Sequence, residues 1–438
     1  MRTFILGGAA LAALVGTTAT AHAAARTLTI DEAVALALRS NPQLAAGRAR
    51  AEATDAQATS VGRRMLPSIH VSDEAQYWNA PFIPNFAGAM FTVRDQKTNT
   101  FTAAGDQPLL GLLRANDQRE ALEEQTAAAR AQVAAGEADL RANVESTYLR
   151  VFEAKALEDI AGASIHELAD QVTVAKARLA SGVITNADLL RIEVALANAE
   201  QQQLQAHSQG VTARAQLFAA IGIAPSEAAE MTLVEPADRL STSRAAAVPG
   251  TFQSLLPVAA QRRPELMQHA HLVTSAQRTS GASGFALLPD IDLEGAYIRA
   301  DGQPFQPKNS GFIGLKASWA IWEWGASELQ RKAAVIQAEA AQRDRDMVER
   351  QIESELSASL AQGEAARGAV GSAEKAVASA EEAYRVTDAS VKAGAATTTD
   401  LLQAQSELTQ ARLNLTRAQY ELALSNIALT RATGGATK

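Results

Sequence analysis

The stretch Gly182-Val183-Ile184-Thr185-Asn186-Ala187-Asp188-Leu189-Leu190 returns later in the chain as Gly394-Ala395-Ala396-Thr397-Thr398-Thr399-Asp400-Leu401-Leu402. In both stretches a threonine follows the glycine by three residues, and Asp-Leu-Leu begins three residues after the threonine. A pattern repeated so far along a chain is typical of a duplicated structural unit. We therefore infer the function from this duplication and not from a catalytic motif.

Two further landmarks repeat upstream of the glycine stretches. Asn41-Pro42-Gln43-Leu44 returns as Arg263-Pro264-Glu265-Leu266, and Leu66-Pro67 returns as Leu288-Pro289. These landmarks are shifted by about ten residues more than the glycine stretches are. The first copy should therefore carry an insertion between the Leu-Pro landmark and its glycine.

The N-terminus has the composition of a secretory signal peptide over residues 1–23. Arg2 is followed by an apolar stretch from Phe4 to Val15 and by Ala21-His22-Ala23, which suits signal peptidase, so we expect an exported protein. The apolar stretch is shorter than the ~20 residues of a transmembrane helix. Because the chain has no cysteine, we expect neither disulfides nor a lipid anchor. The net charge of -8, without a basic block, argues against nucleic acid as a partner.

The helical pattern divides the chain into two repeats. Thr29 and Glu32 have the spacing of a capping box, and a helix should begin there, break at Asn41-Pro42 and continue to about Arg64. Its second copy should occupy residues 252–262 and 264–285. The predicted organisation is a signal peptide (1–23), a first repeat (24–222), a proline-rich linker (223–250), a second repeat (251–434) and a C-terminal tail (435–438).

After each Leu-Pro landmark the pattern changes from helical to alternating, which predicts a β-hairpin in each repeat. In the second repeat, residues 290–297 place Ile291, Leu293 and Tyr297 on one face and Asp290, Asp292 and Glu294 on the other. Residues 311–322 alternate in the same way, after a turn that begins near residue 300. In the first repeat, residues 69–77 alternate with Asp73 on the apolar side, the insertion is expected near 78–90, and the return strand near 91–107.

Strands with one apolar face and one polar face are typical of either a soluble β-sandwich or a membrane barrel. Four strands are too few to close a barrel. Trp319, Trp322 and Trp324 cluster where an aromatic girdle would sit at a membrane surface. We therefore favour a barrel closed by more than one copy of the chain.

The remaining segments of each repeat predict long helices. Residues 109–180 and 326–393 are each free of proline, and each would extend about 100 Å. A helix of about half that length should follow each of them, beginning near Thr185 or Thr397. The last helix has a coiled-coil seam in which large residues alternate with small ones, and the first copy has a looser version. The seam positions are Leu401, Leu408, Leu415, Leu422 and Leu429 with Ala404, Ala411, Ala418 and Ser425, and in the first copy Ile192, Ala199, Ala206 and Ala213.

No motif for chemistry stands out. The sequence has no Gly-rich phosphate loop, no nucleophile elbow and no metal-ligand motif. The close pair His269 and His271 should point apart on a helix, which favours a solvated face over a metal site. We therefore expect neither an enzyme nor a cofactor or metal.

The glycine stretches should be the turns between each long helix and the shorter one. Gly182 and Gly394 suit a left-handed helix end. Asp188 and Asp400 each follow a threonine at the spacing of a capping box, which explains both acids as local structure. If several chains close into a tube, the same acids would also form a ring around its opening. Both interpretations stay open at this point.

Together, the signal peptide, the doubled helix-hairpin-helix unit, the Leu28-to-Ala33 opening with Asn41-Pro42, and the paired Gly-x-x-Thr-x-x-Asp-Leu-Leu turns resemble the TolC-like outer-membrane efflux factor family. The resemblance covers essentially the whole mature chain. It implies a mainly α-helical fold with four strands per chain, and a homotrimer with a twelve-stranded barrel in the outer-membrane lipid and helices extending into the periplasm. It also implies a passive exit duct for a tripartite efflux pump or a type I secretion system, with a periplasmic adaptor and an inner-membrane transporter as partners.

The resemblance also assigns site residues. It implies that an adaptor contacts the helix-turn tips and that Asp400 constricts the periplasmic entrance, with Asp188 at the equivalent place in the first copy. A second acid of the family pattern is Gln403 here, and a basic residue of that pattern is Ala396, so a double acidic ring with a salt-bridge latch is not expected. The implied tip residues are Gly182, Val183, Thr185, Gly394, Ala395 and Thr397.

A rival from another class is a periplasmic structural or adaptor coiled coil without a pore. It predicts a protein whose hairpins face water on both sides and that is extracted without detergent. The sequence does not identify the cargo, which ranges from drugs and metal ions to a polypeptide.

Overall fold

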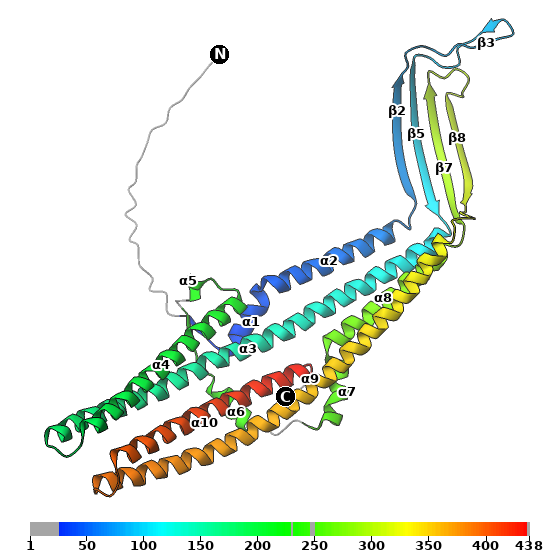
Figure 1. The fold of residues 1–438 in the computed structure, drawn as a ribbon. Helices are drawn as coiled ribbons and strands as arrows, with labels where there is room; N and C mark the ends of the chain where they lie inside the picture. The colour runs from blue at the N-terminus through cyan, green and yellow to red at the C-terminus, as the bar shows by residue number, and fades with distance from the viewer. Residues whose placement is uncertain (1–25, 229–230, 246–249, 436–438) are drawn as a thin grey trace, which may run out of the picture.

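The computed structural model describes residues 26–228, 231–245 and 250–435. The predicted signal peptide and the tail residues 436–438 lie outside the described residues. The molecule is elongated, with a β-sheet at one end and the turns of two helical hairpins at the other (Figure 1).

The two repeats contain the same elements in the same order. The first repeat has α1 (Ile30–Ser40), α2 (Pro42–Arg63), β2 (Ser68–Tyr77), β5 (Lys97–Pro108), α3 (Gly111–Ala180) and α4 (Asn186–Ile221). The second has α7 (Phe252–Arg262), α8 (Pro264–Phe285), β7 (Asp290–Asp301), β8 (Asn309–Ser318), α9 (Ala326–Lys392) and α10 (Thr398–Ala432). The smaller elements are β1 (Arg26–Leu28), β3 (Asn85–Phe86), β4 (Ala89–Met90), α5 (Pro225–Ala228), β6 (Met231–Leu233) and α6 (Ala237–Ala245).

Local side-chain chemistry sets where the first helices begin. The Thr29 hydroxyl accepts from the backbone N–H of Glu32, whose carboxylate accepts from the N–H of Thr29 at 2.9 Å, so the predicted capping box starts α1. The Asn41 side chain caps α2 by accepting from the N–H of Gln43 at 2.9 Å. Arg263, at the corresponding place in the second repeat, is buried and binds Glu355 at 2.8 Å.

The four long strands form one antiparallel sheet in the order β2-β5-β7-β8, so β2 and β8 are open edges. The pairing register places most residues of like polarity on the same face, with the exceptions of Asp73, which lies opposite Phe101, and of Ile298 and Phe312, which lie on the polar face. The face that we call the apolar face carries Ile69, Val71, Phe101, Ala103, Ile291, Leu293, Tyr297, Ile313 and Leu315. The opposite, polar face carries His70, Ser72, Glu74, Thr100, Thr102, Asp106, Asp292, Glu294 and Lys316.

The structure corrects two predicted strand limits. The return strand of the first hairpin begins at Lys97 rather than near residue 91, because Lys97 pairs with Tyr77, the last residue of β2. The last strand ends at Ser318 rather than near Trp322, because Ser318 pairs with Asp290, the first residue of β7. The connection 78–96 is longer than its counterpart 302–308 and holds β3 and β4, so the insertion lies where it was expected.

The predicted linker is integrated into the fold. Its strand β6 pairs in parallel with β1, which the sequence pattern did not reveal. The buried Tyr148 of α3 fixes this pair, since its hydroxyl lies 2.7 Å from the Leu28 carbonyl and 2.6 Å from the Val234 carbonyl, and accepts from the Val234 N–H at 3.0 Å. Burial raises the pKa of Tyr148 to about 12. The largest core cluster surrounds this point and joins α1, α3, α4 and α10.

The helical hairpins α3–α4 and α9–α10 run side by side toward the end opposite the sheet (Figure 1). The predicted seam of α10 is confirmed at most positions, because Leu408, Leu422 and Leu429 are buried together with Ala404, Ala411 and Ser425. The remaining seam residues, Leu401, Leu415 and Ala418, are half-buried. The seam residues of α4 are likewise buried: Ile192, Ala199, Ala206 and Ala213.

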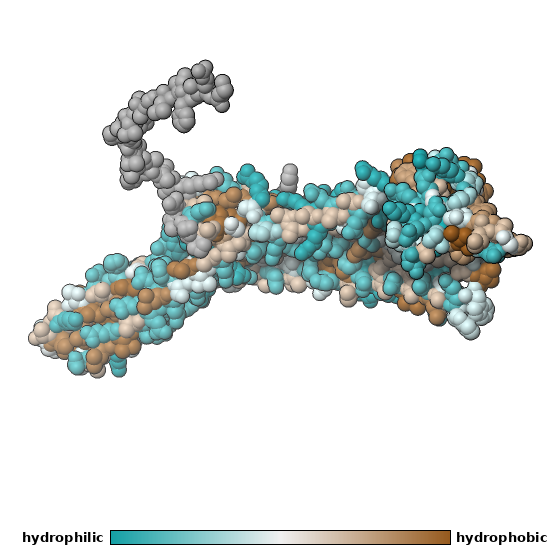
Figure 2. Space-filling view, turned by 90° about the horizontal axis from the view of Figure 1, so that it is seen from above, coloured by the Kyte–Doolittle hydropathy of each residue, from teal (hydrophilic) through white to brown (hydrophobic). Residues whose placement is uncertain are grey.

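Hydrophobic residues reach the surface at both ends of the molecule (Figure 2). Within the described ranges, none of the helices combines the length and the apolar character that crossing a membrane requires.

Candidate functional site: the turns at the helical end

The two repeated glycine stretches form matching turns. Gly182 has φ 74°, and the backbone N–H of Val183 donates to the carbonyl of Arg178 at 2.9 Å. Gly394 has φ 77°, and the N–H of Ala395 donates to the carbonyl of Ser390 at 2.8 Å. These bonds close the last turns of α3 and α9 in the Schellman pattern, which requires the left-handed conformation that glycine adopts without strain. The prediction that both glycines end a long helix is confirmed.

Both repeated acids cap the helix that follows the turn. The Thr185 hydroxyl donates to Asp188 Oδ2 at 2.7 Å, and the Thr185 N–H donates to the same oxygen at 3.0 Å. Thr397 and Asp400 make the same two bonds at 2.7 and 2.8 Å. The hydroxyl and backbone bonds lower the pKa of both carboxyls below the ordinary value of 3.8. The capping interpretation of Asp188 and Asp400 is therefore confirmed.

The residues predicted for the entrance and for adaptor contact lie together at the turns. Val183 is 70% exposed, and Ala395 and both capping threonines are exposed as well. Asp400 is exposed, whereas Asp188 is partly covered. The exposed Gln403 donates to Glu407 of its own helix at 2.7 Å. The turns therefore present small, uncharged groups around two carboxylates.

A bond between the two hairpins was not predicted. Arg191 lies 3.7 Å from Asp188 and donates from Nη1 to the Thr399 hydroxyl of the other turn at 2.9 Å. The Arg191 spacing from Asp188 is visible in the sequence, but its partner in the second repeat is not. This pair links the two turns at the outermost end of the hairpins.

Further from the turns, a buried amide holds the hairpins together. Gln405 of α10 is 2% exposed and accepts from Gln171 Nε2 at 2.6 Å, while its own Nε2 donates to Glu167 Oε2 at 3.1 Å. A cavity of about 340 Å³ lies beside these residues, with Tyr384 and Lys392 in its wall. Burial raises the pKa of Tyr384. The contact between the hairpins at Gln405 is therefore polar, and it borders a cavity.

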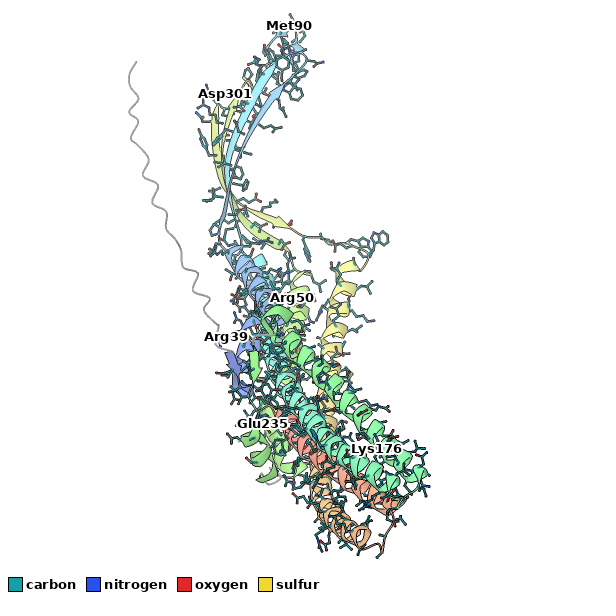
Figure 3. All side chains as sticks on the ribbon, turned by 90° about the vertical axis from the view of Figure 1, so that its left-hand side faces the viewer. Arg39, Arg50, Met90, Lys176, Glu235 and Asp301 are labelled. Carbon is teal, nitrogen blue, oxygen red and sulfur yellow. The ribbon has the colours of Figure 1, made fainter. Side chains whose placement is uncertain are left out.

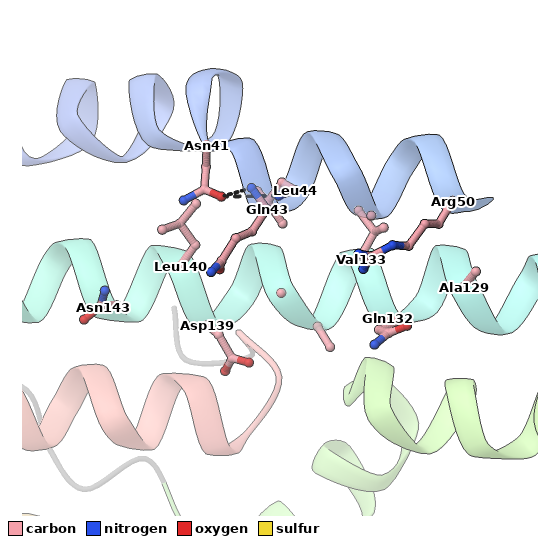
Figure 4. A pocket seen from close by; sticks show the side chains of 13 residues that line it. Asn41, Gln43, Leu44, Arg50, Ala129, Gln132, Val133, Asp139, Leu140 and Asn143 are labelled. Carbon is pink, nitrogen blue, oxygen red and sulfur yellow. Dashed lines mark hydrogen bonds between the residues drawn. The ribbon is translucent and has the colours of Figure 1, made fainter. Parts of the chain in front are cut away.

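A second groove, of about 580 Å³, lies between α2 and α3 (Figure 4). Its polar residues include Asn41, which is engaged in capping α2, and Asp139, which binds Arg431 at 2.6 Å. In the part of the chain that the structure describes, no group of histidine and acidic side chains has the arrangement of a metal site. His271 instead lies 2.6 Å from Glu124.

The fold and the turns define a class of protein. Its members are elongated and built from a duplicated set of long helices, with a sheet that has one apolar and one polar face at one end and paired, capped turns at the other. The chain belongs to the outer membrane efflux protein family, whose sequence model matches residues 33–223 and 255–435. The predicted family and the outer-membrane localisation are thereby confirmed. This family consists of channel proteins.

Individual relatives are more distant. The outer membrane efflux protein BepC of Brucella suis is 25% identical over 255 residues, which cover 56% of this chain and 53% of that protein. This chain thus aligns with about half the length of that curated relative. The outer membrane channel CmeC of Campylobacter jejuni has a similar fold, with a TM-score of 0.80 at 16% identity over 93% of this chain and 86% of that one. VceC of Vibrio cholerae gives 0.78 at 18% identity over 93% and 96%.

Proposed function

We propose that the protein is the outer-membrane exit duct of a tripartite efflux pump or a type I secretion system, and that it performs no chemistry of its own. The observation that carries the proposal is the four-stranded sheet, which has one apolar face, one polar face and two open edges. A soluble coiled coil gains nothing from such a sheet. A membrane channel uses the apolar face against lipid and the polar face against water.

The open edges argue for assembly. The unpaired backbone groups of β2 and β8 lie on a sheet whose apolar face suits lipid, where unpaired groups are costly. Pairing β8 of one copy with β2 of the next satisfies both edges, and three copies would give twelve strands. Because the helices continue from these strands, the same symmetry would extend them as a tube into the periplasm.

The turns at the helical end are suited to meet the partner proteins. The exposed groups of Gly182, Val183, Thr185, Gly394, Ala395 and Thr397 offer a small, uncharged surface for a periplasmic adaptor, which would connect the duct to an inner-membrane transporter. Three copies would bring the carboxylates of Asp400 around one entrance. The transporter supplies the energy, and the duct supplies the path.

Opening of the entrance would require the two hairpins of each copy to separate at their turns. The bond from Arg191 to Thr399 opposes that separation at the outermost point, and the Gln405 contacts act further in. Adaptor binding that replaces the Arg191 bond would bias the hairpins toward the open arrangement.

Removal of this bond tests the proposal. Arg191→Ala should raise the conductance of the purified protein in planar lipid bilayers, because it frees the turns without altering the helices. Thr399→Val should have the same effect, and the double variant should add little to either. Leu204→Ala, at an exposed position further along α4, serves as the control. A wild-type protein that gives no channels in bilayers would contradict the proposed function.

A further inference from the structure

The outer end of the sheet carries a hairpin that has no counterpart in the second repeat. We call residues 78–96, which connect β2 to β5, the finger. At its end, β3 and β4 are joined by Ala87 and Gly88, with φ 54° and 89°, which is a two-residue hairpin turn. The sequence from Tyr77 to Val93 contains no charged residue. The finger is therefore an extension of the first hairpin that is uncharged up to Val93, with Arg94 and Asp95 at its base.

Contacts fix the finger to both hairpins of the sheet. The N–H of Phe82 donates to the Arg94 carbonyl at 2.8 Å, and the Arg94 guanidinium stacks 3.5 Å from the ring centre of Trp78. The N–H of Asp95 donates to the carbonyl of Gly302 at 2.8 Å, which ties the finger to the β7–β8 connection. These bonds fix the base of the finger to the sheet.

The end of the finger nevertheless exposes large apolar side chains. Phe86 and Met90 are each 74% exposed. Phe305 of the neighbouring connection packs against Phe91 with tilted rings, 5.4 Å between ring centres, and is itself exposed. Contiguous exposed apolar groups of this kind mark a binding surface. The other exposed members of the group are Phe82 and Ile83.

Charged residues separate this surface from the apolar face of the sheet. Asp301 pairs with Arg299 at 3.1 Å and with Lys308 at 3.2 Å, and Lys97 begins the neighbouring strand β5. Such charges are costly in hydrocarbon, so they mark the level of water or lipid headgroups. Met90 lies beyond Asp301, further from the helices (Figure 3). The lipid acyl chains that would cover the apolar face should therefore end before the level of the finger, on the side nearer the helices.

We propose that the fingers of the assembled copies meet over the channel axis and cover one another, so that the exit has an apolar constriction. This inference rests on the proposed function. The finger continues directly from β2, the open edge at which a second copy would pair, so symmetry would place equivalent apolar ends around one opening. An apolar constriction excludes water and ions until it widens. It would act at the opposite end of the duct from the Asp400 turns.

The absence of native cysteine permits a direct test. In the full chain carrying Phe86→Cys, mild oxidation should convert most of the protein into disulfide-linked copies, because a disulfide requires Cα atoms within about 7 Å. Gln306 lies in the short β7–β8 connection and is also exposed, and the Gln306→Cys variant should remain unlinked. A Phe86→Cys thiol that stays free and reacts fully with a water-soluble maleimide would overturn the inference.

Conductance provides an independent readout. Phe86→Ser combined with Met90→Ser should raise single-channel conductance without changing the number of copies, because polar ends no longer exclude water. Unchanged conductance, or quenching of a fluorophore at position 86 by brominated lipids, would place the finger elsewhere and contradict the constriction. Failure of the proposed function itself would be seen differently, as a wild-type protein without channel activity.

Discussion

At the residue scale, one side chain can serve structure and transport together. Asp400 closes a capping box with Thr397, and this local role explains why an acid stands at that position. The same carboxylate remains exposed and, with its lowered pKa, stays charged at neutral pH. The capping role and the role in a charged ring are therefore compatible. They can be distinguished by one variant that removes only the charge and another that removes only the cap.

Asp400→Asn should reduce the cation preference of the channel in bilayers, because it removes the charge and keeps an oxygen that accepts from Thr397. Thr397→Ala should instead loosen the turn, seen as faster hydrogen exchange at the start of α10, and keep the cation preference. Because the folded pKa lies below 3.8, the wild-type preference should persist as pH falls to that value and be lost only below it. The contribution of the cap to stability should disappear over the same acidic range. Unchanged currents in Asp400→Asn would leave the cap as the whole explanation.

Tyr148→Phe should destabilise the protein by about 1–3 kcal/mol, because it removes the buried hydroxyl that binds the Leu28 and Val234 carbonyls, while the Val234 N–H keeps its bond to the Leu28 carbonyl at 3.1 Å. The N-terminal strand should then become sensitive to protease. Tyr420→Phe is the matched control, since Tyr420 is equally buried but its hydroxyl makes no hydrogen bond within the described residues. Equal losses in chemical unfolding for both variants would show that the hydroxyl of Tyr148 does not fix β1 and β6.

At the element scale, the sequence predicts most of the helices because their signals are local. The Thr29 box, the two X-Pro breaks and the turn glycines each act within one helical turn, so the structure reproduces these boundaries. Strand ends depend on partners distant in the chain, which explains why β5 and β8 were placed wrongly. The strands β1 and β6 are too short to show any period.

The same distinction applies to the candidate site. The turns and their capping acids follow from the repeated sequence, but the link from Arg191 to Thr399 joins the two repeats and depends on how the hairpins pack. The buried Gln405 likewise stands beside seam residues and acquires its partners only in the folded chain.

The narrow seam of α10 predicts a size limit at its small positions. Ala411→Leu should lower stability by about 1–3 kcal/mol, because extra methylenes at a buried alanine force neighbouring helices apart. Gln410→Leu adds an apolar side chain at the adjacent exposed position and should have little effect. The midpoint of chemical unfolding in detergent measures both. Equal tolerance of the two variants would contradict close helix packing at this seam.

At the scale of the whole molecule, different parts of the protein suit different solvents. The sheet has one apolar face, the helical hairpins carry a mixture of polar and apolar residues on their surface, and the capped turns lie at the far end. Duplication gives each copy two hairpins of each kind, but one copy leaves both sheet edges open. The proposed function therefore requires several copies that share one closed sheet in lipid.

The mass of the purified protein in detergent tests this claim most directly. Native mass spectrometry of the detergent-solubilised chain should give a complex of three copies, because twelve strands close the sheet and leave no edge unpaired. A protein that dissolves in water without detergent and has the mass of a single copy would contradict the account.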